Sequence, residues 1–567
     1  PSELIAGMEV YKSSQADLVE GGVGGTVNVK TRKPLDMDAN SGVLSVKGTY
    51  ASGSEETDPE FSGLYSFKND AETIGVLVAA AQSDYSLVRK GFEATPTWNQ
   101  YIAPVSFHQT KEREALNVVA QFRPTEAIEF GINYMDLTLG ANGVNQGVWI
   151  AGAPGAGDPP CQVSHQNVPV YCEHKNGSSA PSYFDSRSRQ AEMTSETVDA
   201  WFTYTAEAAK LETRFGTTEA TGGTSFENSI WAGIDLPTKG ITDFRGDTAR
   251  LIGNFDSSIS YLPASGAFLD MSAVVKQPNE DQEDYFQADL TFDLDLGPLT
   301  SIKTGARQTE HTAGARQYKY NGNYTYNAAD GYEKRELLTD GLIAGGTDQD
   351  ILIPKTNAKY LDAITMKIAG NNFAEDRSGY KSLTEENTSL YVMGNFEVDG
   401  VRGNLGFRYI QTDASSEYYV PGVNPDDATG LPVNKGFTTT LATDKASYDD
   451  VLPSFNVAFD LTDDLILRAS AAKVITRSNF NDMYATTSVA GLNDNNPNNG
   501  TATRGNIGLL PYTSNQADVG LEWYFSEGSV ASAAYFNKTV TNFVVPSVST
   551  GVSIGVPDGD KGGADSW

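Results

Sequence analysis

The feature that most constrains the fold is a regular alternation between very short and very long connections. Short polar turns such as 68–72 and 461–464 alternate along the chain with long segments such as 140–195 and 313–385. Such long connections argue against a compact soluble domain, in which loops beyond about 15 residues are uncommon. In transmembrane β-barrels, by contrast, short turns on one rim alternate with long loops on the other. The alternation therefore predicts an all-β, antiparallel transmembrane barrel.

The segments between these connections carry apolar residues at every second position, which indicates strands. Phe286, Leu290 and Phe292 are apolar, for example, and Asp289 and Asp293 lie between them. One face of such a strand suits hydrocarbon and the other suits water. Soluble sandwiches also alternate, but their strands usually have about 5 to 6 residues. The pattern predicts about fifteen strands, at residues 42–51, 61–68, 73–84, 112–122, 127–139, 196–204, 211–219, 283–295, 300–312, 386–398, 402–414, 447–460, 464–474, 514–525 and 529–540.

The two chain ends carry further expectations. An open sheet in lipid would leave backbone groups unpaired in hydrocarbon, and each such group costs several kcal/mol. An odd set of strands therefore predicts that closing strands follow Trp567 and that the chain stops within an extracellular loop. Pro1 is not a start residue, so any export signal would lie in a missing N-terminus, and the absence of a signal decides nothing.

Composition excludes some classes of partner and anchor. The formal net charge of -32 argues against nucleic acid, whose phosphates need a basic surface. The longest apolar run, 74–81, is far shorter than the roughly 18 to 20 residues of a spanning helix. The content of 55 Gly, 27 Tyr and 25 Phe favours a turn-rich, aromatic-rich β protein over a helical bundle.

The N-terminal segment carries the most specific motif. Glu9, Val10, Tyr11 and Lys12 form a short strand that leads into the glycine-rich turn 21–25, and Val-Asn-Val follows at 27–29. Glycines of this kind permit positive φ and close approach of backbones. In this order the segment resembles the end of the plug domain of TonB-dependent receptors.

Three later stretches, 284–307, 448–480 and 510–538, resemble the barrel of the Caulobacter-type or oligosaccharide-type branch of these receptors. They contain Asp450-Val-Leu-Pro-Ser-Phe-Asn and Gly520-Leu-Glu-Trp-Tyr-Phe. The resemblance implies a 22-stranded barrel filled by a plug. It assigns residues 1–38 to the C-terminal part of the plug domain and residues 39–567 to a barrel that is incomplete at its C-terminus.

The same resemblance implies function. It indicates an active transporter of the Gram-negative outer membrane that imports a scarce nutrient, with an oligosaccharide favoured over a ferric siderophore or another metal chelate. The implied partners are the inner-membrane TonB complex, outer-membrane lipid and lipopolysaccharide. A TonB box would precede Pro1. A passive porin and a non-transport barrel stay open as alternatives, although the plug segment argues against a porin.

No catalytic arrangement is present in the sequence. None of the four His residues lies in a zinc-protease spacing or beside a nucleophile motif, so neither enzyme activity nor a cofactor is expected. Acidic clusters such as 449–450 and 558–565 lack the spacing of a calcium loop and are expected to be solvated rim charges. No resident metal is predicted.

The only two cysteines, Cys161 and Cys172, lie in one long connection. At a cell surface such a pair most often forms a disulfide that limits loop entropy. Together with His165 and His174 the pair could instead bind zinc, because sulfur and imidazole ligands lie close in sequence. The disulfide is the favoured prediction.

Aromatic residues in the long connections are candidate ligand contacts. Ring faces stack on sugars while neighbouring polar groups bind hydroxyls, although rings of this kind also form interfacial girdles. The candidates are Trp98, Tyr101, Trp149, Trp231, Tyr318 and Tyr320. On the plug segment, Lys12 and Arg32 are expected to pair with barrel carboxylates such as Asp289 and Glu522. A plug held by polar contacts is easier to displace than one with a dry core.

Overall fold

The protein is almost entirely β-structure. The computed structural model describes residues 4–97, 100–175, 182–234, 240–246, 249–253, 267–269, 273–320, 338–346, 349–422, 436–490, 500–552 and 556. Fifteen long strands form one antiparallel sheet, which confirms the predicted fold class and strand number. They are β3 (Ser41–Ala51), β4 (Glu56–Lys68), β5 (Ile74–Thr95), β6 (Tyr101–Thr125), β7 (Ile128–Trp149), β10 (Ser182–Thr205), β11 (Ala209–Ile234), β15 (Val275–Leu296), β16 (Leu299–Ala315), β21 (Lys381–Val398), β22 (Val401–Pro421), β23 (Phe437–Thr462), β24 (Leu465–Thr476), β27 (Tyr512–Ser526) and β28 (Ser529–Thr541).

Consecutive long strands pair as hairpins from β3 to β28, which gives the strand order of a barrel. The short strands β14 (Ala267–Leu269), β17 (Tyr318–Tyr320) and β20 (Phe373–Glu375) extend this sheet at one end. In residue-by-residue register, β28 pairs with β27 and β3 pairs with β4. Among the described residues no such residue-by-residue register joins β28 to β3, although the strand order is that of a closed barrel.

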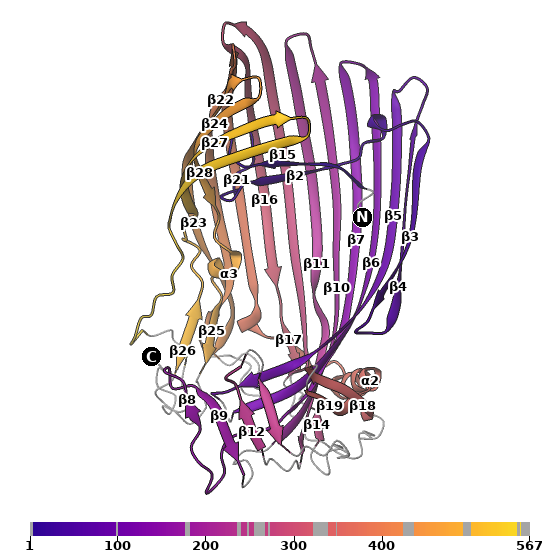
Figure 1. Cartoon of the computed structure of the whole chain (residues 1–567), viewed down its shortest axis with the longest axis vertical. Helices are drawn as coiled ribbons and strands as arrows, with labels where there is room; N and C mark the ends of the chain where they lie inside the picture. The colour runs from indigo at the N-terminus through magenta and orange to yellow at the C-terminus, as the bar shows by residue number, and fades with distance from the viewer. Residues whose placement is uncertain are drawn as a thin grey trace.

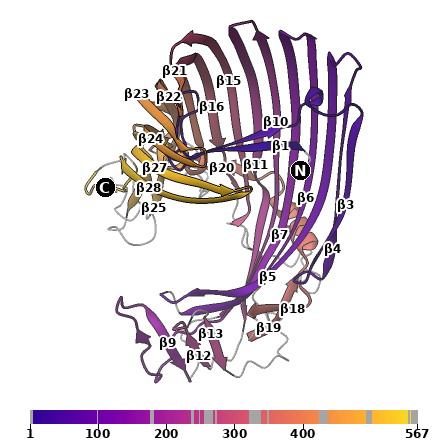
Figure 2. The same ribbon diagram turned by 45° about the horizontal axis from the view of Figure 1, so that its top comes forward.

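The small hairpin of β1 (Ile5–Tyr11) and β2 (Thr26–Thr31) lies within the curve of this large sheet, as both views show (Figures 1 and 2). The 3-10 helix η2 (Pro34–Asp36) follows it and leads into β3. The backbone N–H of Leu35 donates to Gln121 Oε1 at 2.9 Å, which ties this connection to the inner side of β6. We call residues 4–37 the inner hairpin segment.

The two faces of the large sheet differ in chemistry. On the outward face, the rings of Phe122 and Phe130 are each 46% exposed and their centroids lie 6.5 Å apart. On the inward face, Asn117 and Gln121 are buried and polar. In a soluble protein the apolar side chains face inward and the polar ones face outward. The opposite arrangement found here suits a strand with lipid on its outer side and water or a plug on its inner side.

The long connections gather at one end of the sheet, which we call the long-connection end (Figure 1). Two of them together form a four-stranded sheet: β8 (Gln162–Val163) and β9 (Pro169–His174) come from the connection between β7 and β10, and β12 (Gly240–Asp243) and β13 (Arg250–Gly253) come from the connection between β11 and β15. Others form β25 (Thr487–Ala490), β26 (Thr501–Arg504), the short helix α3 (Phe480–Met483) and the 3-10 helix η5 (Arg377–Gly379). None of the described helices is long and apolar enough to cross a membrane.

A further unit at this end consists of the hairpin β18 (Leu338–Gly346) and β19 (Gln349–Thr356), followed by the helix α2 (Ala358–Ala369). Asn357 caps α2 by accepting a hydrogen bond from the Tyr360 N–H. Leu361 and Ile364 of the helix are buried in one apolar core with Ile102 and Phe184 of the long strands. This core fixes the β18–β19–α2 unit against the ends of β6 and β10.

Candidate functional site

The loop of the inner hairpin segment, residues 12–25, forms the closest contact between the hairpin and the sheet. Its shape depends on glycine, because Gly21 and Gly25 have φ of 126° and 136°, where other residues are strained. A Cβ added to Gly25 would lie 2.9 Å from the Tyr11 backbone oxygen. The glycine motif of the sequence therefore makes a tight turn that lies close to the sheet.

Glu20 is the charged centre of this contact. Its carboxylate accepts hydrogen bonds from Arg408 Nε and Arg477 Nη2, each at 2.8 Å. The side chains of Glu20 and Arg408 are only 6% and 5% exposed. Burial alone would raise the pKa of Glu20, but the two guanidinium groups outweigh it and hold that pKa at about 2. Glu20 is therefore ionised at neutral pH and linked to two different parts of the sheet.

The ion pair extends outward into the wall. Arg408 also donates from Nη2 to Ser389 Oγ at 2.6 Å, and Arg477 Nε lies 3.9 Å from Glu385. Burial lowers the pKa of Arg477, but the carboxylate of Glu20 reverses that effect and leaves it raised. The negative charge of Glu20 is thereby balanced by Arg408 of β22 and by Arg477 in the segment after β24, and both arginines also lie close to polar side chains of β21.

Most of the remaining contacts are polar as well. Lys303 forms an ion pair with Asp17 at 2.7 Å, and Lys538 donates to the Val23 backbone oxygen at 2.7 Å. Further hydrogen bonds join Asn404 to Gln15, Asn456 to Ser14, Thr476 to Gly21 and Gln516 to Val23.

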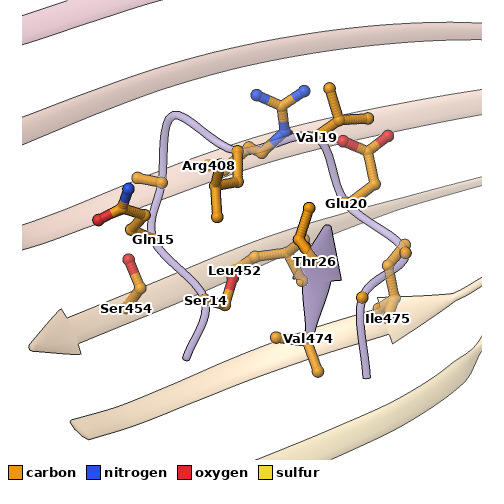
Figure 3. Close-up of a pocket in the computed structure, with 14 residues that line it drawn as sticks. Ser14, Gln15, Val19, Glu20, Thr26, Arg408, Leu452, Ser454, Val474 and Ile475 are labelled. Carbon is orange, nitrogen blue, oxygen red and sulfur yellow. Dashed lines mark hydrogen bonds and ion pairs between the residues drawn. The ribbon is translucent and has the colours of Figure 1, made fainter. Parts of the chain in front are cut away.

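Apolar contact in this interface is small. Within loop 12–25, the described residues form one buried apolar group with the wall, Ala16 with Tyr391 and Met393. At the base of the inner hairpin segment, Leu4 packs in a second buried apolar cluster with wall residues such as Leu77. Figure 3 shows Gln15 and Glu20 on the loop above the strands that carry Arg408, Ser454 and Val474. The cavity enclosed there has about 20 Å³, room for about one water molecule. The contact of loop 12–25 with the wall is thus mainly polar and includes several charge-assisted bonds.

The predicted plug contacts lie elsewhere in this interface. Lys12 and Glu522 line one cavity of about 540 Å³, and the charge of Lys12 acts on Glu522 through space. The hydrogen bonds of Glu522 come from Arg468 and Tyr524, each at 3.0 Å. Asp289 accepts from Tyr391 at 2.5 Å and from Gln287 at 2.7 Å. The backbone N–H of Arg32 donates to Leu4 at 2.9 Å.

Sequence reasoning missed the strongest contacts of the hairpin, those of Asp17 and Glu20. A usable signal was present, because Glu20 is the carboxylate next to the run Gly-Gly-Val-Gly-Gly, where backbones approach closely. An acid at such a position needs a cationic partner when it becomes buried.

Three of the aromatic candidates come together at the long-connection end. The ring centroids of Tyr101 and Trp149 lie 6.3 Å apart, and Tyr183 lies 6.3 Å from Tyr101 and 5.9 Å from Trp231. We call these four residues the aromatic cluster. Their register places them on the inward face, the face that carries Glu129 on β7. Tyr101 is only 1% exposed, whereas Trp149 and Trp231 are half-buried.

The remaining aromatic candidates do not join this cluster. Tyr318 and Tyr320 form β17, and Tyr320 packs against the apolar core of the β18–β19–α2 unit. Trp98 lies outside the described residues.

A second aromatic group, which the sequence did not suggest, lies around Glu375. This carboxylate accepts from Arg316 at 2.8 Å and from the hydroxyl of Tyr419 at 2.9 Å. Arg316 lies over the ring of Tyr380 at 5.0 Å, and Arg377 lies over the ring of Tyr419 at 5.5 Å. Rings and paired charges at one place suit a ligand with both flat apolar faces and hydroxyl or acid groups.

Cys161 and Cys172 are joined by a disulfide, as predicted. Their sulfurs are therefore not available as thiolate ligands for zinc. Within the part of the chain that the structure describes, no three His, Cys, Asp or Glu side chains are grouped so as to hold a metal ion.

Comparison with known proteins adds a family and a fold. The family of TonB dependent receptor-like β-barrels matches residues 225–557. No curated protein matches the chain in sequence.

Two solved structures illustrate the likeness in fold. The siderophore receptor PirA from Acinetobacter baumannii is 11% identical, with 98% of this chain and 60% of that chain covered and a TM-score of 0.52. A point mutant of the ferric enterobactin receptor PfeA from Pseudomonas aeruginosa is 14% identical, with 95% of this chain and 58% of that chain covered and a TM-score of 0.51. The chain thus spans about three fifths of the length of each.

Proposed function

Because this chain belongs to the family of TonB dependent receptor-like β-barrels, we propose that it forms the inner hairpin and most of the wall of an outer-membrane receptor that actively imports a scarce nutrient. Membership implies a partnership with TonB and a receptor role, not an enzymatic one. In this proposal residues 1–38 end a plug domain and residues 39–567 build the barrel of a Gram-negative outer-membrane protein.

The observation that carries the proposal is the polar attachment of the inner hairpin segment. A transporter must hold a plug tightly at rest and release it when pulled. Charge-assisted hydrogen bonds such as those of Glu20 contribute about 1.5 to 3 kcal/mol each, and water can replace them as they break. A dry apolar interface of the same strength would have to expose its whole surface at once. The contacts of loop 12–25 therefore suit release under load.

A hairpin lying against the inner wall also supports a receptor over a passive porin. A porin conducts through an open lumen, whereas here Glu20 and Asp17 tie a separate segment to the wall. The proposed cycle begins with ligand capture at the long-connection end and proceeds by displacement of the segment toward the short-turn end.

For cargo we favour an oligosaccharide, and the aromatic cluster supports this choice. Trp149 and Trp231 are half-buried rings on the inward face, beside the entrance that the long connections surround. Sugar rings stack on such indoles. A ferric siderophore is the second candidate, because two receptors of similar fold are named for such ligands: PirA is named as a siderophore receptor and PfeA as a ferric enterobactin receptor.

The experiment is a calorimetric titration of the detergent-purified protein with a panel of oligosaccharides and ferric siderophores. Trp149→Ala and Trp231→Ala are compared with Trp523→Ala, which removes an indole that is 53% exposed on β27. Saturable sugar binding that weakens about tenfold in the first two variants and is unchanged in the third supports the proposal. Binding of siderophores alone would replace the cargo, and binding of neither class would reject both.

A further inference from the structure

A row of side chains crosses five neighbouring long strands just below the aromatic cluster. Strands β5, β6, β7, β10 and β11 lie side by side in both views (Figures 1 and 2). Their register aligns one residue from each strand in a single line across the sheet: Arg89, Phe107, Asn145, Arg187 and Ser229. We call these five residues the arginine row.

The arginine row faces the interior. Phe122 of β6 is 46% exposed on the outward face. The register of β6 with β5 runs without a shift from Tyr101 to Phe122, so the odd-numbered Phe107 lies on the opposite, inward face. The β18–β19–α2 unit packs on the outward face, where Ile102 and Phe184 join its core. That unit therefore does not cover the arginine row.

Arg89 is exposed and lies against an aromatic ring. Its guanidinium carbon is 5.4 Å from the ring centroid of Phe107. Stacking on a ring fixes the plane of a guanidinium group and leaves its N–H edge available to a ligand. Among the described residues no carboxylate forms an ion pair with Arg89.

The second arginine of the row is only partly neutralised. The side chain of Arg187 is 46% exposed, and its Nη1 lies 3.7 Å from Glu227 Oε1. Glu227 is engaged more closely by Arg189, whose Nε and Nη2 both contact Oε2. A long contact with a carboxylate that is already paired neutralises little of the charge of Arg187.

The inner wall carries an excess of positive charge at this level. The arginine row and the two inward rows directly above and below it hold three arginines and two carboxylates: Arg89, Arg187, Arg189, Asp185 and Glu227. The chain as a whole has a net charge of -32. A local excess of positive charge in so acidic a protein favours an anionic ligand.

The spacing of the two arginines favours an elongated ligand. Arg89 on β5 and Arg187 on β10 are separated by β6 and β7. Neighbouring strands lie about 4.8 Å apart, so the Cα atoms of the two arginines are roughly 14 Å apart. A single sugar ring is shorter than this distance. Acid groups spaced along a chain suit the arrangement better than acid groups gathered around one metal ion.

Small residues and an indole beside the arginines suit sugar rings. In the row above, Gly91 and Gly147 carry no side chain, and a Cβ added to Gly91 would meet no atom within 4 Å. The half-buried Trp231 stands in that row, two residues from Ser229 on β11 and therefore roughly 7 Å away. A sugar that lies on this open stretch of wall can stack on the indole while its acid group reaches Arg187.

We propose that the arginine row binds an oligosaccharide built from uronic acids, whose sugars carry carboxylate groups. This inference rests on the proposed function and narrows its cargo from oligosaccharides in general to acidic ones. Arg89 and Arg187 each bind one carboxylate of the chain, because the fork of a guanidinium group matches the two oxygens of a carboxylate. Phe107 holds Arg89 in place, and Trp231 binds a ring face.

The test compares a linear oligomer of galacturonic acid with its methyl ester, by calorimetric titration of the full chain in detergent. Esterification removes the charge and keeps the ring faces. We expect the ester to bind about 100-fold more weakly than the acid, or about tenfold per arginine, the lower end of the range for hydrogen bonds to charged groups. Added salt should weaken binding of the acid but not of the ester.

Two double variants locate the effect. Arg89→Gln, Arg187→Gln should bind the acid about 100-fold more weakly and should no longer distinguish it from the ester. Arg214→Gln, Arg402→Gln is the matched control, because it removes the same charge from side chains that are 57% and 42% exposed and pair with Asp199 and Asp460. The control should bind the acid as the unaltered protein does. Equal melting temperatures of the two variants would show that both are folded.

The outcomes separate this inference from the proposed function. Equal affinity of the unaltered protein for the acid and its ester would overturn the inference and leave import of a neutral oligosaccharide standing. Equal losses in both double variants would overturn it as a general charge effect. Binding of a ferric siderophore alone, weakened in Arg89→Gln, Arg187→Gln, would assign the row to an anionic chelate. Binding of neither sugars nor siderophores would reject the proposed cargo as well.

Discussion

Replacing Glu20 by glutamine tests how the inner hairpin segment is held. The change keeps the shape of the side chain but removes the negative charge between Arg408 and Arg477, of which Arg408 is 5% exposed. Removing one partner of a buried ion pair costs about 3 to 5 kcal/mol, because the other charge stays buried. The amide oxygen still accepts one hydrogen bond and Arg477 keeps Glu385 at 3.9 Å, so we expect the lower value, about 3 kcal/mol.

Native-state hydrogen exchange measures this loss directly. Amides of loop 12–25, such as Leu18, whose N–H donates to Gln15 at 3.2 Å, exchange when the loop leaves the wall. A loss of about 3 kcal/mol predicts roughly 100-fold faster exchange there, with the long strands unaffected. Glu9→Gln is the matched control, because Glu9 pairs with Lys30 at the exposed side of the same hairpin. Equal exchange in Glu20→Gln and Glu9→Gln would refute the assignment of Glu20 as the main attachment.

Three other perturbations have defined outcomes. The pKa of Glu20 is lowered to about 2 in the folded protein. The contribution of Glu20 to the stability of the loop is therefore complete above its unfolded pKa of about 4.3 and is lost as the pH falls toward 2. After correction for intrinsic rates, the exchange rate of the loop amides should be constant from about pH 7 to 5 and should increase below about pH 4. Gly25→Ala places a Cβ on a residue with φ of +136° and close to a backbone carbonyl, so the free energy of opening measured at the same amides should fall by about 1 to 3 kcal/mol. In Gly24→Ala the added Cβ meets no atom within 4 Å, so this free energy should be unchanged. Cys161→Ser with Cys172→Ser should destabilise the β8–β9–β12–β13 sheet by ~3 kcal/mol and expose it to protease; unchanged cleavage would contradict that.

The sequence predicts the strands well because the lipid boundary imposes a pattern on them. Each of the fifteen predicted segments falls on a different long strand, and 402–414, for example, lies within β22 (Val401–Pro421). The prediction missed the strand ends that lie near the long connections. The strand predicted at 73–84, for example, is only the first half of β5, which runs over Ile74–Thr95. Alternation of apolar and polar residues persists only where the outward face meets hydrocarbon. Beyond that level both faces are polar, and backbone pairing continues without a hydropathy signal.

The site was predicted less completely than the fold. The disulfide of Cys161 and Cys172 could be predicted because the two cysteines lie close together in the sequence, and the structure confirms it. The pairing of Glu20 with Arg408 joins residues 388 positions apart, and no local pattern indicates which wall residue meets which loop residue. The choice of Lys12 and Arg32 followed the charges nearest the motif, and it did not include Asp17 and Glu20, which form ion pairs with the wall.

The length of the strands has a consequence for how a ligand first meets the protein. β11 has 26 residues, which at about 3.3 Å per residue and a tilt of about 40° rise at most roughly 65 Å. The apolar band of a membrane barrel needs only about 25 Å of this. In an outer membrane the surplus would stand as a stiff collar beyond the hydrocarbon. A diffusing molecule would then meet the mouth of the barrel well above the hydrocarbon, so that its first contact is with protein and not with the lipid surface.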